Sequence, residues 1–209
     1  PFFTVLVLPF ILYIALLPAM PVMEPDEGRY SLIPYEMNAS GDYITPHLKG
    51  VVYFEKPPLC YWATALAFKV FGDTPFASRL FAGLCGWGCI LLAYCVGLRL
   101  HDRTTGAYGA AILSTFLFPF FVGRVNVLDM PLAFFVSLAV WSGFLHLADE
   151  KRRKRWLYLL YFAAALAFLT KGVIGAVFPP AVVVLWLLSA RRWRDILRSV
   201  AVGVLARPG

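Results

Sequence analysis

Met23-Glu24-Pro25-Asp26-Glu27-Gly28-Arg29-Tyr30 follows directly on an apolar run from Phe2 to Pro21. That run has about the length needed to cross a hydrocarbon core of roughly 30 Å. Three carboxylates and an arginine therefore lie where the chain is predicted to leave a membrane. A removable signal peptide fits less well, because the run is longer than a usual signal core and no small-residue cleavage site follows it.

The composition of the whole chain is that of an integral membrane protein. Of its 209 residues, 60% are hydrophobic and only 15% are charged, which lies outside the usual range of soluble domains. The net charge of +7 comes from short basic clusters between apolar runs, so it indicates membrane topology and predicts no nucleic-acid partner. The four cysteines form no CxxC pair and are predicted to be small core residues.

Apolar segments of spanning length recur along the chain and predict an all-α, polytopic transmembrane helix bundle. The predicted spans are 2–20, 75–98, 105–122, 131–147, 156–169 and 173–190, with a seventh starting near Ile196. The chain begins without Met and stops soon after a new apolar stretch begins. We therefore expect it to be the N-terminal part of a longer membrane domain.

Charge is divided between the two sets of loops in a way that predicts orientation. Three linkers, at 99–103, 151–155 and 191–198, hold more than half of the 19 lysines and arginines. Alternating spans place these linkers on one side, and the positive-inside rule makes that side cytoplasmic. Eight of the 12 acidic residues fall on the other side, so we expect any chemistry to take place outside.

The exterior loop 21–74 is too long for a simple turn and is expected to carry structure of its own. Pro25 suits a first helical position, and Asp26 and Glu27 suit a first helical turn. These signals predict a short, bent helix along the membrane surface that ends at Asn38 or Gly41. A second interfacial helix is predicted to start at Pro57-Pro58, where tryptophan, tyrosine and apolar residues follow.

Phe54-Glu55-Lys56-Pro57-Pro58-Leu59 contains an acid and a base beside that second helix. Lys56 precedes a proline, which favours an extended backbone, and can lie next to a helix N-terminus that already favours anions. A phosphate would be well placed there. Glu55 can ligate a divalent cation or pair with Lys56; a plain surface ion pair would contribute little.

Two further charges lie in exterior turns between spans. Asp129 precedes Met130-Pro131, where a helix N-terminus alone would favour an acid, although carboxylates at membrane depth are costly and commonly functional. Lys171 lies in the turn before the last complete span. Its side chain either snorkels from a helix end, which is the commoner reason for such a lysine, or contacts a lipid phosphate.

Three motifs, in this order, resemble a known family: residues 24–30 (EPDEGRY), 54–59 (FEKPPL) and 128–134 (LDMPLAF). They are similar to those of the 4-amino-4-deoxy-L-arabinose lipid A transferases and their relatives in the protein mannosyltransferase group, which are multi-spanning C-type glycosyltransferases. The resemblance extends from the first span to about Ala190.

The resemblance implies roles for particular residues. Asp26 and Asp129 match the two essential acids of the family. Lys56 matches a phosphate-contacting lysine and Glu55 a metal-ligating glutamate, so a divalent cation such as Zn²⁺ or Mg²⁺ is implied. Arg29 and Tyr30, which follow the first acid, are implied in donor phosphate binding. Additional candidates are Glu27, Arg124 and Lys171; the family's histidine metal ligand is expected beyond residue 209.

The implied function is transfer of a sugar from undecaprenyl phosphate to lipid A at the periplasmic face of a bacterial inner membrane. Transfer of mannose or another hexose from a polyprenyl phosphate to protein or another envelope glycan is the alternative within enzymes. Outside enzymes, an ion-coupled transporter could use membrane-level carboxylates. The acids in exterior loops and the lack of visible inverted repeats favour the enzyme.

Overall fold

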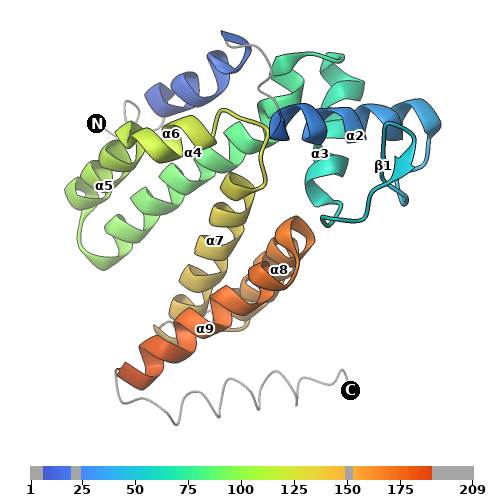
Figure 1. Cartoon of the computed structure of the whole chain (residues 1–209). Helices are drawn as coiled ribbons and strands as arrows, with labels where there is room; N and C mark the ends of the chain where they lie inside the picture. The colour runs from blue at the N-terminus through green and yellow to red at the C-terminus, as the bar shows by residue number, and fades with distance from the viewer. Residues whose placement is uncertain (1–6, 20–24, 149–152, 190–209) are drawn as a thin grey trace.

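The computed structural model describes residues 7–19, 25–148 and 153–189, and in these ranges the protein is helical apart from one short hairpin (Figure 1). The elements run in the order η1 (Ile11–Ala15), η2 (Leu17–Ala19), α2 (Asp26–Ser40), β1 (His47–Leu48), β2 (Val51–Val52), α3 (Leu59–Phe71), α4 (Pro75–Leu100), α5 (Arg103–Thr115), α6 (Leu117–Val122), α7 (Asp129–Ala148), α8 (Arg153–Lys171) and α9 (Val173–Ser189).

Both helices predicted between residues 21 and 74 are present. α2 begins directly after Pro25, continues through Pro34 and ends at Gly41, whose φ of 75° is a conformation that glycine adopts without steric cost. α3 begins after Pro57-Pro58 and ends at Gly72. The helix signals in this loop therefore predicted both helices correctly, because prolines and glycines delimit helices through the backbone conformations that they favour.

The hairpin β1–β2 was not predicted. His47 pairs with Val52 and Leu48 with Val51, and Lys49 and Gly50 turn the chain with positive φ. The carboxylate of Glu36 in α2 accepts hydrogen bonds from the backbone N–H groups of Lys49 (2.8 Å) and Gly50 (3.3 Å). The hairpin is thereby held against α2 and brings the residues after it back toward the start of that helix.

Among the described residues, α4 and α7 are long and apolar enough to cross a membrane by length and composition. The segment predicted as one span at 105–122 is not one continuous helix, because the chain breaks into α5 and α6 at Phe116, whose ψ is 127°. In a continuous helix, the ring of Pro119 would clash with the carbonyl of Thr115 four residues earlier. An extended residue between them removes that clash.

Close backbone contacts hold the helices together. A Cβ on Gly106 of α5 would lie 2.6 Å from the carbonyl oxygen of Tyr94 in α4, so these two helices meet with no side chain between them. The ring of Tyr13 fills the space between Gly86 of α4 and Gly123, where a Cβ would approach ring atoms to 2.8 and 2.7 Å. The N-terminal segment is thereby packed against both α4 and the loop after α6.

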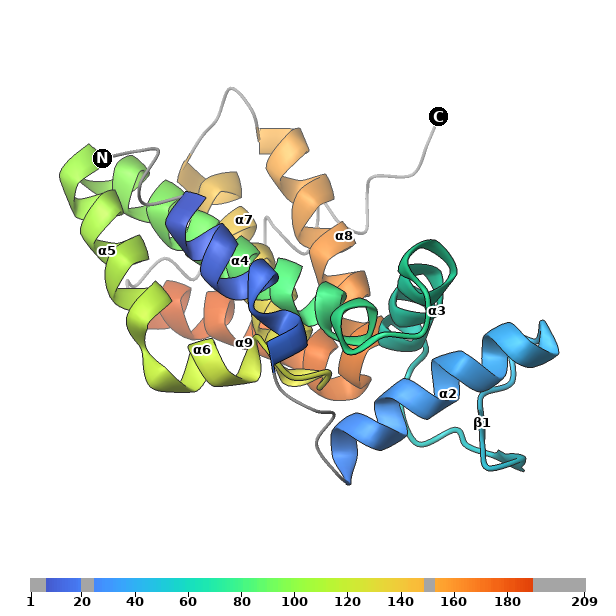
Figure 2. The ribbon, with the colours of Figure 1, turned by 90° about the horizontal axis from the view of Figure 1, so that it is seen from above.

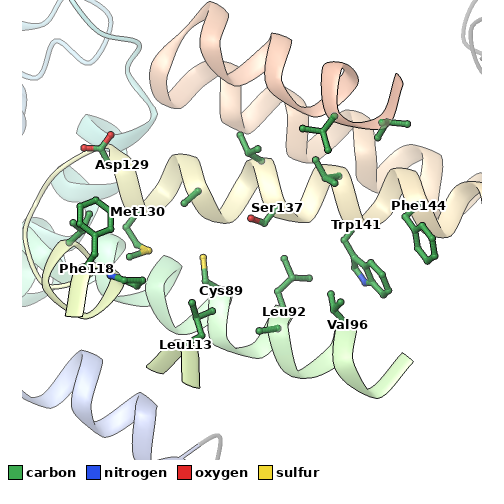
Figure 3. Close-up of a pocket in the computed structure, with 18 of the residues that line it drawn as sticks. Cys89, Leu92, Val96, Leu113, Phe118, Asp129, Met130, Ser137, Trp141 and Phe144 are labelled. Atoms are coloured by element: carbon green, nitrogen blue, oxygen red, sulfur yellow. The ribbon is translucent and has the colours of Figure 1, made fainter. Parts of the chain in front are cut away.

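α4 and α7 run in the same direction, with Cys89 opposite Met130 and Val96 opposite Trp141 (Figure 3). Asn126, three residues before α7, also donates to Ser78 near the start of α4, so the starts of both helices lie at one end of the bundle. We call it the charged end because it also carries Asp26 and Lys171. The basic residues at 99–103 and 153–155 lie at the other end, as the charge pattern predicted. Linker residues 151–152 and 191–198, Glu24 and the start of a seventh span lie outside the described residues.

Candidate functional site

Four charged side chains and a tyrosine form a cluster at the start of α2. Arg29 contacts Asp26 at 2.6 Å and lies 3.7 Å from Glu55, and Lys56 lies 3.1 Å from the other oxygen of Glu55. The hydroxyl of Tyr53 accepts from Arg29 and donates to Glu55. We call Asp26, Arg29, Tyr53, Glu55 and Lys56 the charge cluster. It unites three of the predicted site residues with Asp26.

Local structure explains how this cluster forms. Asp26 and Arg29 lie one helical turn apart at the start of α2, and the hairpin returns Tyr53, Glu55 and Lys56 to the same place. Behind Lys56, α3 begins without a hydrogen bond from a capping side chain, and the dipole of a helix N-terminus favours an anion. The expected placement of Lys56 beside a helix N-terminus is thus present in the structure.

Titration of the cluster reflects these contacts. The hydrogen bond from Tyr53, followed by that from Lys56, holds the pKa of the exposed Glu55 carboxyl below its usual range. The contact with Tyr53 raises the pKa of Arg29, and burial raises the pKa of Tyr30 to about 12, although the charge of Arg29 opposes that shift. At neutral pH the cluster therefore contains a carboxylate at Glu55 and a guanidinium at Arg29, and the neighbouring Tyr30 is a neutral phenol.

Asp129 forms an ion pair with Lys171, at 2.5 Å between the carboxylate and the ammonium. Lys171 thus reaches to a neighbouring helix, and this partner is one that neither snorkelling nor a lipid phosphate contact had predicted. The turn after Lys171 also approaches the charge cluster, since a Cβ on Gly172 would lie 3.8 Å from the Pro57 ring. Asp26 and Asp129 lie at the same end of the molecule, each paired with a different cation.

An apolar groove of about 720 Å³ begins at Asp129 and follows α7 (Figure 3). Its walls come from α4, α5, α6, α7 and α9. The groove passes Met130, Ser137 and Trp141 and reaches Phe144. Carbon atoms make up nearly all of its lining, and the Asp129 carboxylate lies at one of its ends. Its chemistry suits a long apolar chain with a polar group at the end near Asp129.

Glu27, an additional candidate for the site, is buried in the protein interior. Its side chain is 1% exposed and pairs with Arg79 of α4, which is equally buried, at 2.6 and 2.8 Å. Glu27 therefore belongs to the protein interior and not to the charge cluster. Arg79 was not among the predicted site residues, although an arginine one turn inside an apolar helix is costly to bury and usually has a partner.

Arg124 also lies outside the charge cluster. Its guanidinium donates to the carbonyl of Leu16 at 2.8 Å and stacks on Phe120 with 4.8 Å to the ring centroid. These contacts join the loop after α6 to the N-terminal segment, so Arg124 supports the packing of that loop.

Within the described ranges, no group of three or more His, Cys, Asp or Glu side chains could hold a metal ion. The neighbours of Glu55 are two cations and a phenol, which leaves one carboxylate as a ligand. These residues alone do not fit a divalent cation, because such an ion needs several oxygen or nitrogen ligands.

The chain is similar to known membrane transferases. The family model described as dolichyl-phosphate-mannose-protein mannosyltransferase matches residues 55–206. The undecaprenyl phosphate-alpha-4-amino-4-deoxy-L-arabinose arabinosyl transferase of Edwardsiella ictaluri is 36% identical over 208 residues, which is 98% of this chain and 38% of that protein. The corresponding transferase 2 of Sodalis glossinidius is 37% identical over 177 residues, which is 83% of this chain and 32% of that protein.

Two crystal structures of ArnT from Cupriavidus metallidurans have the same fold. The apo structure superposes with a TM-score of 0.89 and 29% identity and covers 96% of this chain and 38% of that one. The structure bound to undecaprenyl phosphate gives 0.88 and 28%, with 95% and 37% covered. The chain thus spans little more than a third of these relatives.

Proposed function

The chain belongs to the dolichyl-phosphate-mannose-protein mannosyltransferase family, and we propose that it is the part of a membrane glycosyltransferase that receives a polyprenyl-phosphate-linked sugar donor. Its likeness to the ArnT structures confirms the predicted all-helical, polytopic membrane fold. The observation that carries the proposal is an apolar groove that ends at the Asp129–Lys171 ion pair, with the turn after Lys171 next to Pro57 and so close to the cations of the charge cluster, because a lipid with an anionic head group needs both features.

The donor phosphate is assigned to the charge cluster. Arg29 and Lys56 are the cations, and Tyr30 is the adjacent neutral donor. Each cation is paired with a carboxylate that is about half exposed or more, so an arriving phosphate can compete for it without opening a buried ion pair. The N-terminus of α3, which has no side-chain cap, adds backbone dipoles that favour the same charge.

The apolar groove is assigned to the polyprenyl chain. It starts at Asp129, and from Met130 to Phe144 the part of its wall that α7 forms is apolar except for Ser137. A relative with the same fold is bound to undecaprenyl phosphate, which has this combination of phosphate and long apolar tail. Burial of apolar surface in the groove would contribute most of the affinity, and the phosphate contacts would set the register.

The two acids act on the acceptor. During transfer, the bond from the anomeric carbon to the phosphate oxygen breaks, and its electron pair stays with the leaving phosphate beside Arg29 and Lys56. An acceptor oxygen forms the new bond to the anomeric carbon. A hydroxyl acceptor passes its proton to Asp26 or Asp129, whereas a phosphate monoester is already largely ionised at neutral pH and needs only positioning.

The acceptor is lipid A at the periplasmic face of a bacterial inner membrane, and the sugar is 4-amino-4-deoxy-L-arabinose. The names of the arabinosyl transferase relatives support the sugar and the undecaprenyl phosphate carrier. The separation of the basic residues from the charge cluster supports the side of the membrane. A divalent cation at Glu55 would need further ligands from residues outside the described ranges.

The test uses the full-length protein in vesicles with a synthetic aminoarabinose donor on undecaprenyl phosphate and with lipid A. We expect mass spectrometry to show lipid A with one added aminoarabinose. Transfer of mannose to a protein acceptor in the same vesicles, with unmodified lipid A, would instead assign the chain to the activity in the family's description. Ion-coupled uptake without any transfer would contradict both.

A further inference from the structure

A buried junction joins four parts of the chain beneath the charged end. Both carboxylate oxygens of Glu27 accept from Arg79, at 2.6 Å from Nε and 2.8 Å from Nη2. The third guanidinium nitrogen of Arg79 donates to the carbonyl of Leu17 at 2.7 Å. The pair therefore ties α2 and α4 to the end of the N-terminal segment.

The same carboxylate also holds the loop between α6 and α7. Oε1 of Glu27 accepts from the backbone N–H of Asn126 at 3.0 Å. The Asn126 side chain donates to the carbonyl of Tyr30 at 3.1 Å and to the hydroxyl of Ser78 at 3.0 Å. Asn126 is 6% exposed, so its position is determined by these contacts and not by solvent. We call Glu27, Arg79, Asn126 and Ser78 the junction.

The junction is adjacent in sequence to both acids of the proposed site. Glu27 follows Asp26 directly, and successive helical residues point about 100° apart. Asp26 is accordingly exposed by 60% while the Glu27 side chain is fully buried. Asn126 precedes Asp129 by three residues, and the intervening Leu128 is 3% exposed. Asp26 is therefore adjacent to the buried Glu27, and Asp129 lies three residues from Asn126, which is hydrogen-bonded to the same Glu27 carboxylate.

We propose that the junction positions Asp26 relative to Asp129, so that Glu27, Arg79 and Asn126 are positioning residues of the transfer reaction. This inference rests on the proposed function for what the two acids do. A buried carboxylate with two guanidinium contacts and a backbone N–H contact has its oxygens satisfied in one geometry. A shift of the loop against α2 would break at least one of those bonds, so the spacing of the two acids resists change.

Asn126→Ala is the variant that tests this most directly. It removes the three side-chain hydrogen bonds of Asn126, to Tyr30, Ser31 and Ser78, but leaves the Glu27–Arg79 pair and the backbone bond, so no buried charge loses its partner. Ser142→Ala is the matched control, because Ser142 is fully buried in α7 and its hydroxyl donates to Leu138 within that helix. A second variant, Ser78→Ala, removes a single acceptor of Asn126 in case Asn126→Ala does not fold.

Asn126→Ala, Ser78→Ala and the Ser142→Ala control are made in the full-length protein and assayed in vesicles with the undecaprenyl phosphate donor. We expect Asn126→Ala to lower kcat by roughly 100-fold, as a misplacement of about 1 Å can do, while the KM for donor changes less than about twofold. The donor KM is preserved because the charge cluster does not include Asn126. Ser78→Ala should also lower kcat, and Ser142→Ala should leave kcat unchanged.

A distance measurement separates positioning from activity. Spin labels at the exposed Tyr35 of α2 and Leu117 of α6 report how the loop region lies against α2. In Asn126→Ala this distance distribution should broaden. An unchanged distribution, a kcat within about twofold of wild type, or kcat losses shared by the Ser142 control would each overturn the inference. If the wild type transfers no sugar, the proposed function fails while the distance measurement still decides the positioning.

Discussion

At the scale of single residues, two neighbours with the same chemistry have opposite environments. Asp26 and Glu27 are both acids in the first turn of α2, yet Asp26 faces outward beside Arg29 and Glu27 is buried against Arg79. A helix periodicity argument could separate their faces, but the partner of the buried face lies 52 residues away. The side chain with the stronger contacts is thus the structural one, and the exposed one is available to substrate.

Asp26→Asn and Asp129→Asn are both expected to be made and inserted normally but to be nearly inactive. Each exchange keeps the size of the side chain and costs at most about 1 kcal/mol of helix-end stabilisation. Loss of proton transfer and of acceptor positioning lowers turnover by 10²-fold or more for each effect. Lipid A modification by the purified full-length variants is the measurement. Turnover above about a tenth of wild type would remove that acid from the site, because it is less loss than either effect predicts.

Lys56→Ala should raise the donor KM strongly, whereas Lys69→Ala should change it little. Both lysines are near α3, but Lys56 lies in the charge cluster and Lys69 stacks on Tyr43, 4.7 Å from its ring centroid. Lys56→Arg should restore only part of the affinity, because a planar guanidinium replaces a compact ammonium. The measurement is the initial rate of transfer at limiting donor concentration for each variant. Equal rates for Lys56→Ala and wild type would exclude a phosphate role.

At the scale of elements, glycines decide how closely α4 and α5 approach. A Cβ on Gly106 would meet the Tyr94 carbonyl oxygen at 2.6 Å and the Leu98 nitrogen at 3.0 Å, and both are backbone atoms that cannot rotate away. Three residues along α5, a Cβ on Gly109 would make only an ordinary van der Waals contact, with the Ala93 carbonyl oxygen 3.9 Å away. α5 thus contains a tight and a permissive glycine on one helix.

Gly106→Ala should therefore destabilise the protein by about 1–3 kcal/mol through overpacking. Gly109→Ala should have the opposite sign, with up to about 1 kcal/mol gained from helix propensity. Thermal unfolding of the full-length proteins in detergent, compared at one protein concentration, measures both. A Gly106→Ala protein as stable as Gly109→Ala would mean that α4 and α5 are further apart than the structure shows.

At the scale of the whole molecule, the bundle separates two kinds of charge. The starts of α2 and α7 lie at the charged end, and the end of α4 and the start of α8 lie at the other (Figures 1 and 2). Asp26 and Asp129 are the first residues of α2 and α7, Glu55 lies beside Arg29 of α2, and the basic residues at 99–103 and 153–155 lie at the end of α4 and the start of α8. Because positively charged loops are retained in the cytoplasm, this separation predicts that the charged end faces the periplasm. A lipid-linked donor would then meet its acceptor on that side.

Cysteine labelling of intact spheroplasts tests this orientation. In a background with the exposed Cys95 replaced by serine, Asp42→Cys should react with an impermeant maleimide and Lys154→Cys should not. Lys154→Cys should become reactive once the membrane is permeabilised, which controls for burial. The reverse labelling would invert the topology and with it the periplasmic reaction.

The sequence by itself determined the helices of the first loop, the division of charge between the two ends and the membrane class. These features depend on neighbouring residues or on sums over segments: prolines and glycines delimit helices, and hydropathy and charge add up along the chain. The three motifs likewise identified the family before any contact was known. The break at Phe116 and the short hairpin were not predicted from this local information.

The tertiary structure decided which charges act together. Glu27 pairs with Arg79, Asn126 reaches Glu27 across 99 residues, and Lys171 pairs with Asp129 across 42. Such contacts depend on which helix faces meet. Many arrangements satisfy the same hydropathy pattern, and packing at a few glycines and one buried ion pair selects among them. For that reason the sequence could name the acids, but only the fold could show which one is held in the interior and which ones remain open to a substrate.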